Sequence, residues 1–276
     1  MSPRLFGVPA ARVPVVAVLR RGPSDWSHVG RWDVARGVYE PGAWIRSNLY
    51  PQRCDLSPDG RWLCYFTLRG KAAWRAGTTY VAISRLPWLT ALAAWGTCGT
   101  WTRGAHFIDE RGVSKLGPPS EGDVGPCLEE FGLVTTRAAS FAVERRRGWT
   151  ETVDTEPRKP GDTWDESRPV TMQKARPKTD GAVALAVHGW FAAFRSGVPG
   201  ESLYAIVENG RERWLEGVQW ADWDAEGRLL IATEDGRLQI RDGADAATVA
   251  WEHDLAGLTP APAPAPAPPP EEARRW

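Results

Sequence analysis

The chain has 276 residues, and its 34 basic side chains balance its 34 acidic side chains, so the formal net charge is zero. This balance argues against a dedicated nucleic-acid or membrane-surface binder, because such proteins gain affinity from a basic face. Apolar residues at 42% and charged residues at 25% are ordinary values for a globular protein. The unusual counts are 16 Trp, 28 Gly and 23 Pro, which predict short strands joined by tight turns.

Targeting and metal-binding signals are absent from the sequence. The chain has four cysteines, Cys54, Cys64, Cys98 and Cys127. They form no C-x-x-C pair and have no histidine at zinc-ligand spacing, so we expect neither a disulfide framework nor a metal site. The apolar stretch at residues 13–19 is too short for a signal peptide, and no stretch approaches the about 20 apolar residues of a membrane helix. We therefore expect a cytoplasmic protein without cofactors. Its many Arg, Ala, Gly and Pro residues are typical of a GC-rich bacterial genome.

The N-terminal part of the chain alternates apolar segments with turn residues. Strands are predicted at residues 13–20, 26–34, 45–56, 61–68 and 79–84. Residues 86–96 leave two alternatives open. Pro87 near the start and Gly96 at the end favour a short helix, whereas the position within a meander of strands favours another strand.

The middle of the chain contains a charged, proline-rich range at residues 154–181. With so few apolar residues it cannot form a core, so we interpret it as a surface insertion in one domain that spans residues 1–258. The alternative is a linker between two domains. A separate C-terminal domain that begins after residue 181 would be small and would have marginal stability on its own.

The C-terminal part repeats the rhythm of short strands. Six strands are predicted at residues 202–208, 212–215, 218–224, 228–233, 237–242 and 248–253. Asn209-Gly210 is a strong hairpin signal between the first two. From residue 259 the chain alternates Pro and Ala, which predicts an extended, disordered tail over residues 259–276. This tail is either an inert spacer or a peptide for an aromatic groove on another protein.

One motif occurs twice. Residues 55–66 (DLSPDGRWLCYF) align without gaps on residues 222–233 (DWDAEGRLLIAT), and both predict a strand, a tight turn and a strand. In the first copy Pro58 fixes φ for the turn, and Gly60 accepts a positive φ. The second copy repeats the turn one strand later, at residues 234–237.

The segment from Leu56 to Leu63 resembles the blade signature of TolB-type and WD-repeat-like β-propellers, and residues 203–242 resemble the same blade with an altered turn. The resemblance covers residues 45–95 and 202–252. It implies an all-β fold, a degenerate β-propeller of about five or six blades of antiparallel meander strands. A two-sheet sandwich remains an alternative for the same strands. Such propellers include scaffold proteins, enzyme-gating domains and interaction platforms.

Catalytic signals are weak. The motifs of P-loop proteins, serine hydrolases, zincins and dinucleotide-binding enzymes do not occur. His188 is the best candidate for a general base, and Asp222 and Asp224 share a strand face, although they fit a turn-stabilising role better. The alternative function, a propeller-fold hydrolase or lyase, would need three or more of five residues to converge in one pocket: His188, Asp222, Asp224, Arg46 and Arg53. The arginine cluster at residues 145–147 fits a solvated hairpin tip better than a phosphate site.

A binding site is predicted where the chain enters the first recognisable blade. The candidate residues are of the types that dominate binding hot spots or flank them: Trp44, Arg46, Asn48, Tyr50 and Arg53. We therefore predict a non-catalytic, monomeric interaction platform. It would bind a protein partner through loops at the rim of the propeller, without nucleic-acid or membrane binding.

Overall fold

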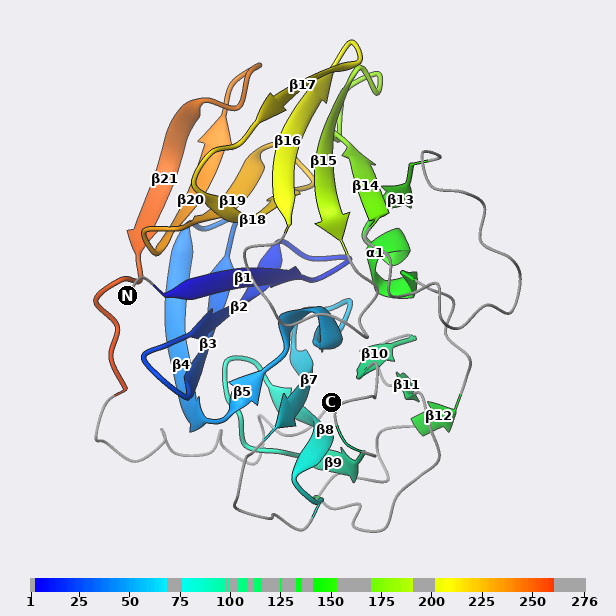
Figure 1. Cartoon of the computed structure of the whole chain (residues 1–276), viewed down its shortest axis with the longest axis vertical. Helices are drawn as coiled ribbons and strands as arrows, with labels where there is room; N and C mark the ends of the chain where they lie inside the picture. The colour runs from blue at the N-terminus through cyan, green and yellow to red at the C-terminus, as the bar shows by residue number, and fades with distance from the viewer. Residues whose placement is uncertain are drawn as a thin grey trace. The chain divides into compact units, whose positions relative to one another are not determined.

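A computed structural model describes residues 3–68, 76–97, 99, 104–108, 112–115, 125, 133–135, 141–152, 170–190 and 202–260. The chain divides into two compact units. Unit 1 comprises Val8–Arg137 and Gly257–Trp276, and unit 2 comprises Ser2–Gly7 and Ala138–Ala256. Figure 1 labels the elements of both units.

The first sheet has four strands, and each pairs with its neighbour in sequence. Its strands are β1 (Arg4–Pro9), β2 (Val15–Arg21), β3 (Trp26–Asp33) and β4 (Val38–Arg46). The last three and the end of β1 belong to unit 1, whereas Arg4–Gly7 of β1 are counted with unit 2. Six of the seven β2 residues are buried, which fits an apolar strand inside the sheet. The strand β4 forms an edge and tolerates Pro41 because the register shifts at a bulge opposite His28 and Gly30.

Two further sheets complete unit 1. Their elements are β5 (Asn48–Leu49), the 3-10 helix η1 (Pro51–Arg53), β6 (Asp55–Leu56), β7 (Trp62–Leu68), β8 (Thr79–Arg85) and β9 (Ala93–Gly96), then β10 (Ala105–Phe107), β11 (Val113–Lys115) and β12 (Leu133–Thr135). The first set pairs antiparallel around β7, whereas β11 and β12 pair in parallel. Buried side chains of β7, β8, β9, β10 and β11 form one hydrophobic cluster that includes Trp62, Phe66 and Phe107.

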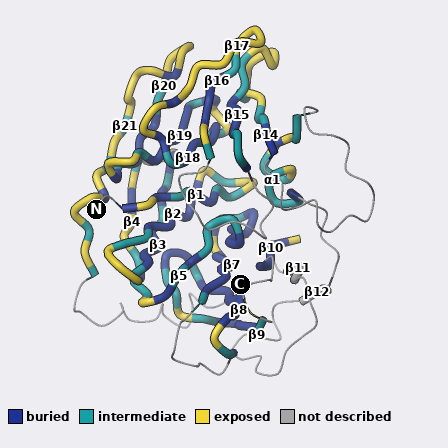
Figure 2. Tube along the Cα trace, in the orientation of Figure 1, coloured by how far each residue is buried: buried dark blue, intermediate teal, exposed yellow. Residues whose placement is uncertain are grey.

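Unit 2 contains a five-stranded and a four-stranded sheet. Its elements are α1 (Ala142–Arg146), β13 (Thr150–Glu151), β14 (Val170–Ala175), β15 (Val183–Trp190), β16 (Leu203–Glu208) and β17 (Arg211–Trp214), then β18 (Val218–Trp223), β19 (Leu229–Thr233), β20 (Arg237–Asp242) and β21 (Thr248–Asp254). Every pairing is antiparallel between strands adjacent in sequence. The edge strands β17 and β21 are largely exposed (Figure 2), whereas β18, at the other edge of its sheet, is mostly buried.

The described residues thus form five sheets, and in four of them the strands follow one another as in a propeller blade. The prediction of an all-β, propeller-like fold is confirmed. The parallel pair in the third sheet departs from the predicted antiparallel meander. Residues 261–276 of the predicted tail lie outside the described residues.

Several local predictions need correction. The single strand expected at residues 45–56 is interrupted, because Pro51 begins a 3-10 turn between β5 and β6. Of the range 86–96, only Ala93–Gly96 forms regular structure, and it is a strand. The charged range 154–181, expected as an insertion, is described from Val170 onward, and there β14 pairs with β15. In β14, Val170 and Met172 alternate into the core, and this short alternation was obscured by the charged residues around it.

The two copies of the repeated motif form equivalent hairpins. The first comprises β6, the turn at Gly60 and β7, and the second comprises β18, the turn at Gly227 and β19. Both glycines have positive φ, +72° and +78°. The aspartates that begin the two aligned copies, Asp55 and Asp222, are both buried.

Candidate functional site

The five predicted binding residues all lie in unit 1, but they separate into two groups. Trp44 and Arg46 are at the end of β4, while Asn48, Tyr50 and Arg53 belong to β5, η1 and the residue between them. The two groups differ in exposure: Arg46 is exposed, whereas Arg53 is buried.

The first group sits at the end of the first sheet, beside the turn between β2 and β3. In the register of that sheet, His28 lies between Arg20 and Trp44, and Trp26 lies opposite Arg46. Because residues two apart share one face of a strand, these five side chains project from the same face. The hairpin thereby gathers two indole rings and two guanidinium groups.

Trp44 is the centre of this group. Its ring centroid lies 4.7 Å from that of His28 and 6.5 Å from that of Trp26, and the two indole planes meet at 82°. The Arg20 guanidinium carbon lies 5.3 Å from the Trp44 ring centroid, within cation–π range. Both indoles remain half-buried. Their edge-to-face packing fixes the rings while part of each stays accessible to solvent.

His28 holds this arrangement from within. It is buried, and its Nε2 accepts a hydrogen bond from the Gly42 amide at 3.2 Å, so Nδ1 carries the proton and faces the Tyr39 hydroxyl oxygen at 3.4 Å. Burial, and then the positive charge of Arg20, lower the pKa of His28 to about 4. A neutral histidine that fastens β3 to β4 has a structural role.

Arg46 is the exposed member of the group. Its Nε donates to Asp25 Oδ2 at 2.8 Å, and 71% of the Arg46 side chain and 50% of the Asp25 side chain are exposed. The hydrogen bond from Arg46 lowers the pKa of the Asp25 carboxyl. We call Asp25, Trp26, Trp44 and Arg46 the Trp–Arg edge.

The second group is part of the core. The Arg53 guanidinium carbon lies 5.0 Å from the Tyr50 ring centroid and 4.9 Å from that of Phe66, and burial lowers the pKa of Arg53. Tyr50 packs against the hydrophobic cluster, and the Asn48 carbonyl accepts a hydrogen bond from the Thr67 hydroxyl at 3.1 Å. These residues position β5 and η1. They do not extend the exposed surface that Arg46 begins.

The residues named for an enzyme are engaged in separate local contacts. In unit 2, Asp222 binds the Lys174 ammonium at 2.6 Å and Asp224 binds the Arg228 side chain at 2.8 Å. His188 lies 3.1 Å from the Thr171 hydroxyl and 3.0 Å from a Glu212 carboxylate oxygen. Arg46 and Arg53 belong to unit 1. Each of the three unit 2 groups thus has local partners within its own unit.

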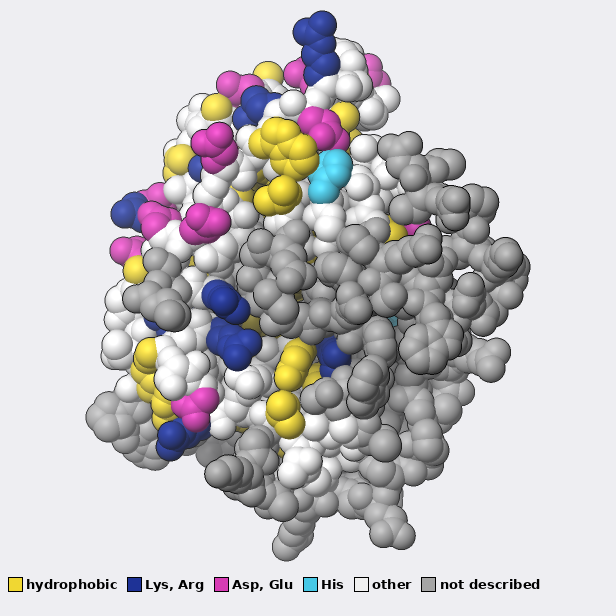
Figure 3. All heavy atoms as spheres, viewed as in Figure 1, with side chains coloured by type: hydrophobic (Ala, Val, Ile, Leu, Met, Phe, Trp, Pro, Cys, Tyr) yellow, Lys and Arg dark blue, Asp and Glu magenta, His cyan; other side chains and the backbone are white. Residues whose placement is uncertain are grey.

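Sequence reasoning missed two features. The first is the position of Asp25 and Trp26 beside Arg46. The turn residues Gly22 and Pro23 predict that a strand begins near Trp26, but they do not show that Arg46 pairs with Trp26. In unit 2, Trp214 and Leu203 are 49% and 58% exposed. The Trp214 ring packs 4.9 Å from that of His188, and Figure 3 shows hydrophobic side chains beside a histidine. The sequence signal for this exposed ring was the alternation of Glu212 with Trp214 along β17.

No group of three or more His, Cys, Asp or Glu side chains among the described residues is arranged to hold a metal ion. Within the same part of the chain, no helix has the length and apolar character needed to cross a membrane.

No protein-family model and no curated protein matches the chain. Among solved structures, it is similar to an uncharacterized protein from Listeria monocytogenes EGD-e, with a TM-score of 0.40 and 10% identity over 91% of this chain and 94% of the other. It is also similar to the β-propeller domain of the Trilobed protease from Pyrococcus furiosus, with a TM-score of 0.33 and 12% identity over 93% of this chain and 86% of that domain. Both likenesses are remote, and the fold assignment rests on the sheets themselves.

Proposed function

We propose that this protein is a non-catalytic interaction platform that binds a protein partner through the Trp–Arg edge. The observation that carries the proposal is the pair of half-buried indoles, Trp26 and Trp44, fixed at one end of a sheet beside the exposed Arg46. Trp and Arg are the residue types that most often dominate protein–protein binding energy. The position beside the β2–β3 turn fits the predicted use of rim loops.

The rigidity of the edge supports the same function. His28 and Arg20 hold the Trp44 ring from behind, so the indole loses little conformational freedom when a partner binds. The proposal includes a closer relation to TolB-type and WD-repeat-like propellers, supported by the turn from Ser57 to Arg61. It also includes a monomeric state and a cytoplasmic location. The balanced charge of the chain supports a partner that is neither nucleic acid nor membrane.

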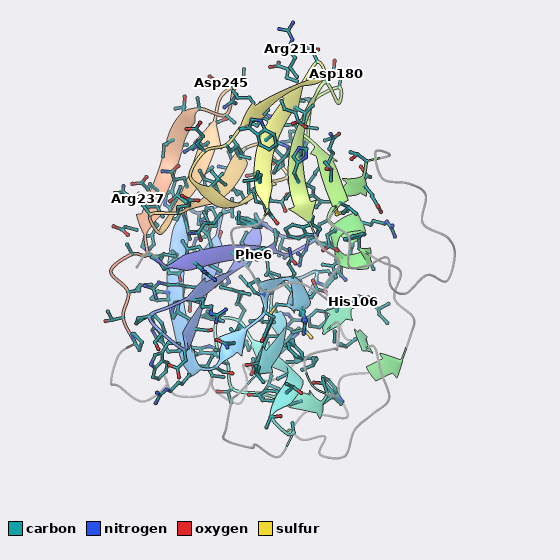
Figure 4. The ribbon with its side chains drawn as sticks, in the orientation of Figure 1. Phe6, His106, Asp180, Arg211, Arg237 and Asp245 are labelled. Carbon is teal, nitrogen blue, oxygen red and sulfur yellow. The ribbon has the colours of Figure 1, made fainter. Side chains whose placement is uncertain are left out.

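The test is affinity capture from an extract of the organism that carries the gene, with wild-type protein and matched variants. Arg46→Glu reverses the charge of the edge, and Arg211→Glu makes the same change at an exposed arginine that points outward from the start of β17 (Figure 4). We expect one protein to be recovered with the wild type and with Arg211→Glu, and to fall at least about tenfold with Arg46→Glu. Equal recovery with Arg46→Glu, or no specific partner, would refute the platform.

A further inference from the structure

Three turns of unit 2 meet at one side chain, that of Arg176. They are the β14–β15 turn (176–182), the β18–β19 turn (224–228) and the β20–β21 turn (243–247). Arg176 is separated along the chain from its bonded residues Gly227 and Ala244 by 51 and 68 positions. Figure 4 labels Asp180 and Asp245, which belong to the first and the third turn.

The guanidinium of Arg176 binds a different carbonyl with each of its three nitrogens. Nε donates to the Gly227 carbonyl at 2.7 Å, Nη1 to that of Ala244 at 2.7 Å and Nη2 to that of Gly243 at 2.8 Å. The guanidinium carbon also lies 5.1 Å from the ring centroid of Trp223, which is buried. The planar group is therefore held by the indole on one face and by carbonyls at its edge.

The second and the third turn are each closed by bonds of their own. Asp224 Oδ1 accepts the Arg228 amide at 2.8 Å, and the Ala246 amide donates to the Gly243 carbonyl at 3.2 Å. Such local bonds permit each turn to open and close without the other. The Arg176 bonds join the turns, and hydrogen bonds from a charged donor are stronger than those between neutral groups.

We propose that Arg176 couples the three turns, so that they open together as one cooperative unit. A guanidinium holds its donors in a fixed planar fork, so it cannot follow one turn outward while its other nitrogens stay on the carbonyls of the rest. Opening of one turn therefore breaks bonds to the others. This inference is independent of the proposed function, because the Trp–Arg edge lies in unit 1 and Arg176 lies in unit 2.

Two other side chains also reach these turns. Lys178 pairs with Glu226, which links the first and the second turn at an exposed position. Arg213 of β17 donates from Nη2 to the Asp245 carbonyl of the third turn. Neither side chain contacts all three turns, and Arg213 therefore provides a matched control for Arg176.

The test is a double-mutant cycle measured by amide hydrogen exchange in the full chain. Asp224→Ala loosens the second turn, and the Ala246 amide reports opening of the third. With Arg176 present, we expect Asp224→Ala to accelerate exchange at Ala246 about fivefold, because the turns open together. In the Arg176→Lys background the acceleration should stay below about twofold, because an ammonium keeps the charge but cannot span three carbonyls.

Two controls separate this coupling from a general loss of stability. In the Arg213→Gln background, Asp224→Ala should still accelerate exchange at Ala246 about fivefold, because the Arg176 bonds remain. The Leu215 amide donates to the Tyr204 carbonyl at 2.9 Å, outside the three turns. Its exchange rate should be the same in all the variants.

Three results would overturn the inference. Exchange at Ala246 that Asp224→Ala leaves unchanged in the wild-type background would show that the turns open separately. Equal acceleration in the wild-type and Arg176→Lys backgrounds would show that the coupling does not depend on the guanidinium fork. Acceleration at Leu215 equal to that at Ala246 would show that the exchange reports unfolding of the whole unit.

Discussion

The two copies of the repeated hairpin, one in each unit, use the same position for different bonds. Asp55 and Asp222 each accept the amide of the following residue, at 2.9 and 2.8 Å. Asp55 then accepts the Phe107 amide of β10 at 2.8 Å, whereas Asp222 accepts from the Lys174 ammonium of β14 at 2.6 Å. The repeat thus preserves a buried carboxylate that links the hairpin to a neighbouring sheet, and it leaves the partner free to change.

The turns of the two hairpins differ in a related way. In the first, Asp59 binds the amide and the side chain of Arg61, while the Ser57 hydroxyl accepts from the Arg61 and Trp62 amides. In the second, Asp224 accepts the Arg228 amide and binds its side chain. Burial alone would raise the pKa of Asp59, but the hydrogen bonds from Ser57 and Arg61 lower it. The carboxylate has moved by two positions and still holds the arginine after the glycine.

The largest effect is expected at Asp222. Asp222→Ala would leave the Lys174 ammonium, 14% exposed, without its buried carboxylate and remove the acceptor of the Trp223 amide. Loss of one partner of a buried ion pair typically costs about 3–5 kcal/mol. We expect a decrease of that size in the free energy of unfolding, measured by urea denaturation.

The matched change at Asp55 sharpens the comparison. Asp55→Ala removes the acceptor of two buried amides, Leu56 and Phe107, and should cost about 2–3 kcal/mol. A cost below about 1 kcal/mol for either substitution would mean that the two aspartates are not anchors.

Acidification should lower the stability of unit 1 through His28. His28 in unit 1 has a pKa of about 4, below its ordinary value of about 6.5, so the unfolded chain takes up this proton more readily. Its contribution to stability is present above pH 6.5 and is lost as the pH falls toward 4, by about 3 kcal/mol in total. Thermal unfolding at a series of pH values measures this loss.

His28→Gln provides the control, because the glutamine oxygen can still accept from the Gly42 amide but does not titrate. The variant should show a flatter dependence of stability on pH between 6.5 and 4. Identical slopes for the variant and the wild type would contradict a neutral, buried His28.

The turn glycines should respond unequally to alanine. A Cβ at Gly227 would lie 2.7 Å from the Pro177 carbonyl oxygen, whereas one at Gly60 would lie 2.9 Å from a methyl group of Val13. Both substitutions also place a side chain at positive φ, which costs about 1–2 kcal/mol. We expect about 2–3 kcal/mol for Gly227→Ala and about 1–2 kcal/mol for Gly60→Ala in urea denaturation. The reverse order would contradict the described packing of the two turns.

The smallest effects concern the carboxylates of the turns. Asp224→Ala removes the acceptor of two amides, Glu226 and Arg228, and should cost about 1–2 kcal/mol. Asp59→Ala should cost only about 0.5 kcal/mol, because the Ser57 hydroxyl still accepts two amides of the same turn. Equal costs, measured by thermal denaturation, would show that the division of roles described for the two turns is incorrect.

The sequence predicted those parts of the fold that depend on local chemistry. The turn residues around Gly60, Gly227 and Gly210 predicted hairpins that the structure contains. The strand β4 was missed because Pro41 and Gly42 are normally breaking signals, and only the bulge opposite β3 accommodates them. A bulge depends on the register between strands, which a single sequence does not reveal.

The candidate site was predicted only in part, for the same reason. Trp44 and Arg46 could be selected by residue type, but their partners, Asp25 and Trp26, come from the β2–β3 turn and the start of the paired strand. Arg53 carries the same residue-type signal and is nevertheless buried between Tyr50 and Phe66. Residue type alone therefore cannot separate a surface arginine from one that the core has enclosed.

Amide hydrogen exchange at Leu56 and Trp223 tests the equivalence of the two hairpins most directly, because each amide donates to the buried aspartate of its own hairpin. We predict slow exchange at both positions, with Asp55→Asn accelerating exchange in the first hairpin and Asp222→Asn in the second. Slow exchange at one position and rapid exchange with solvent at the other in the wild-type protein would contradict the claim that the two hairpins are equivalent units of one propeller-like fold.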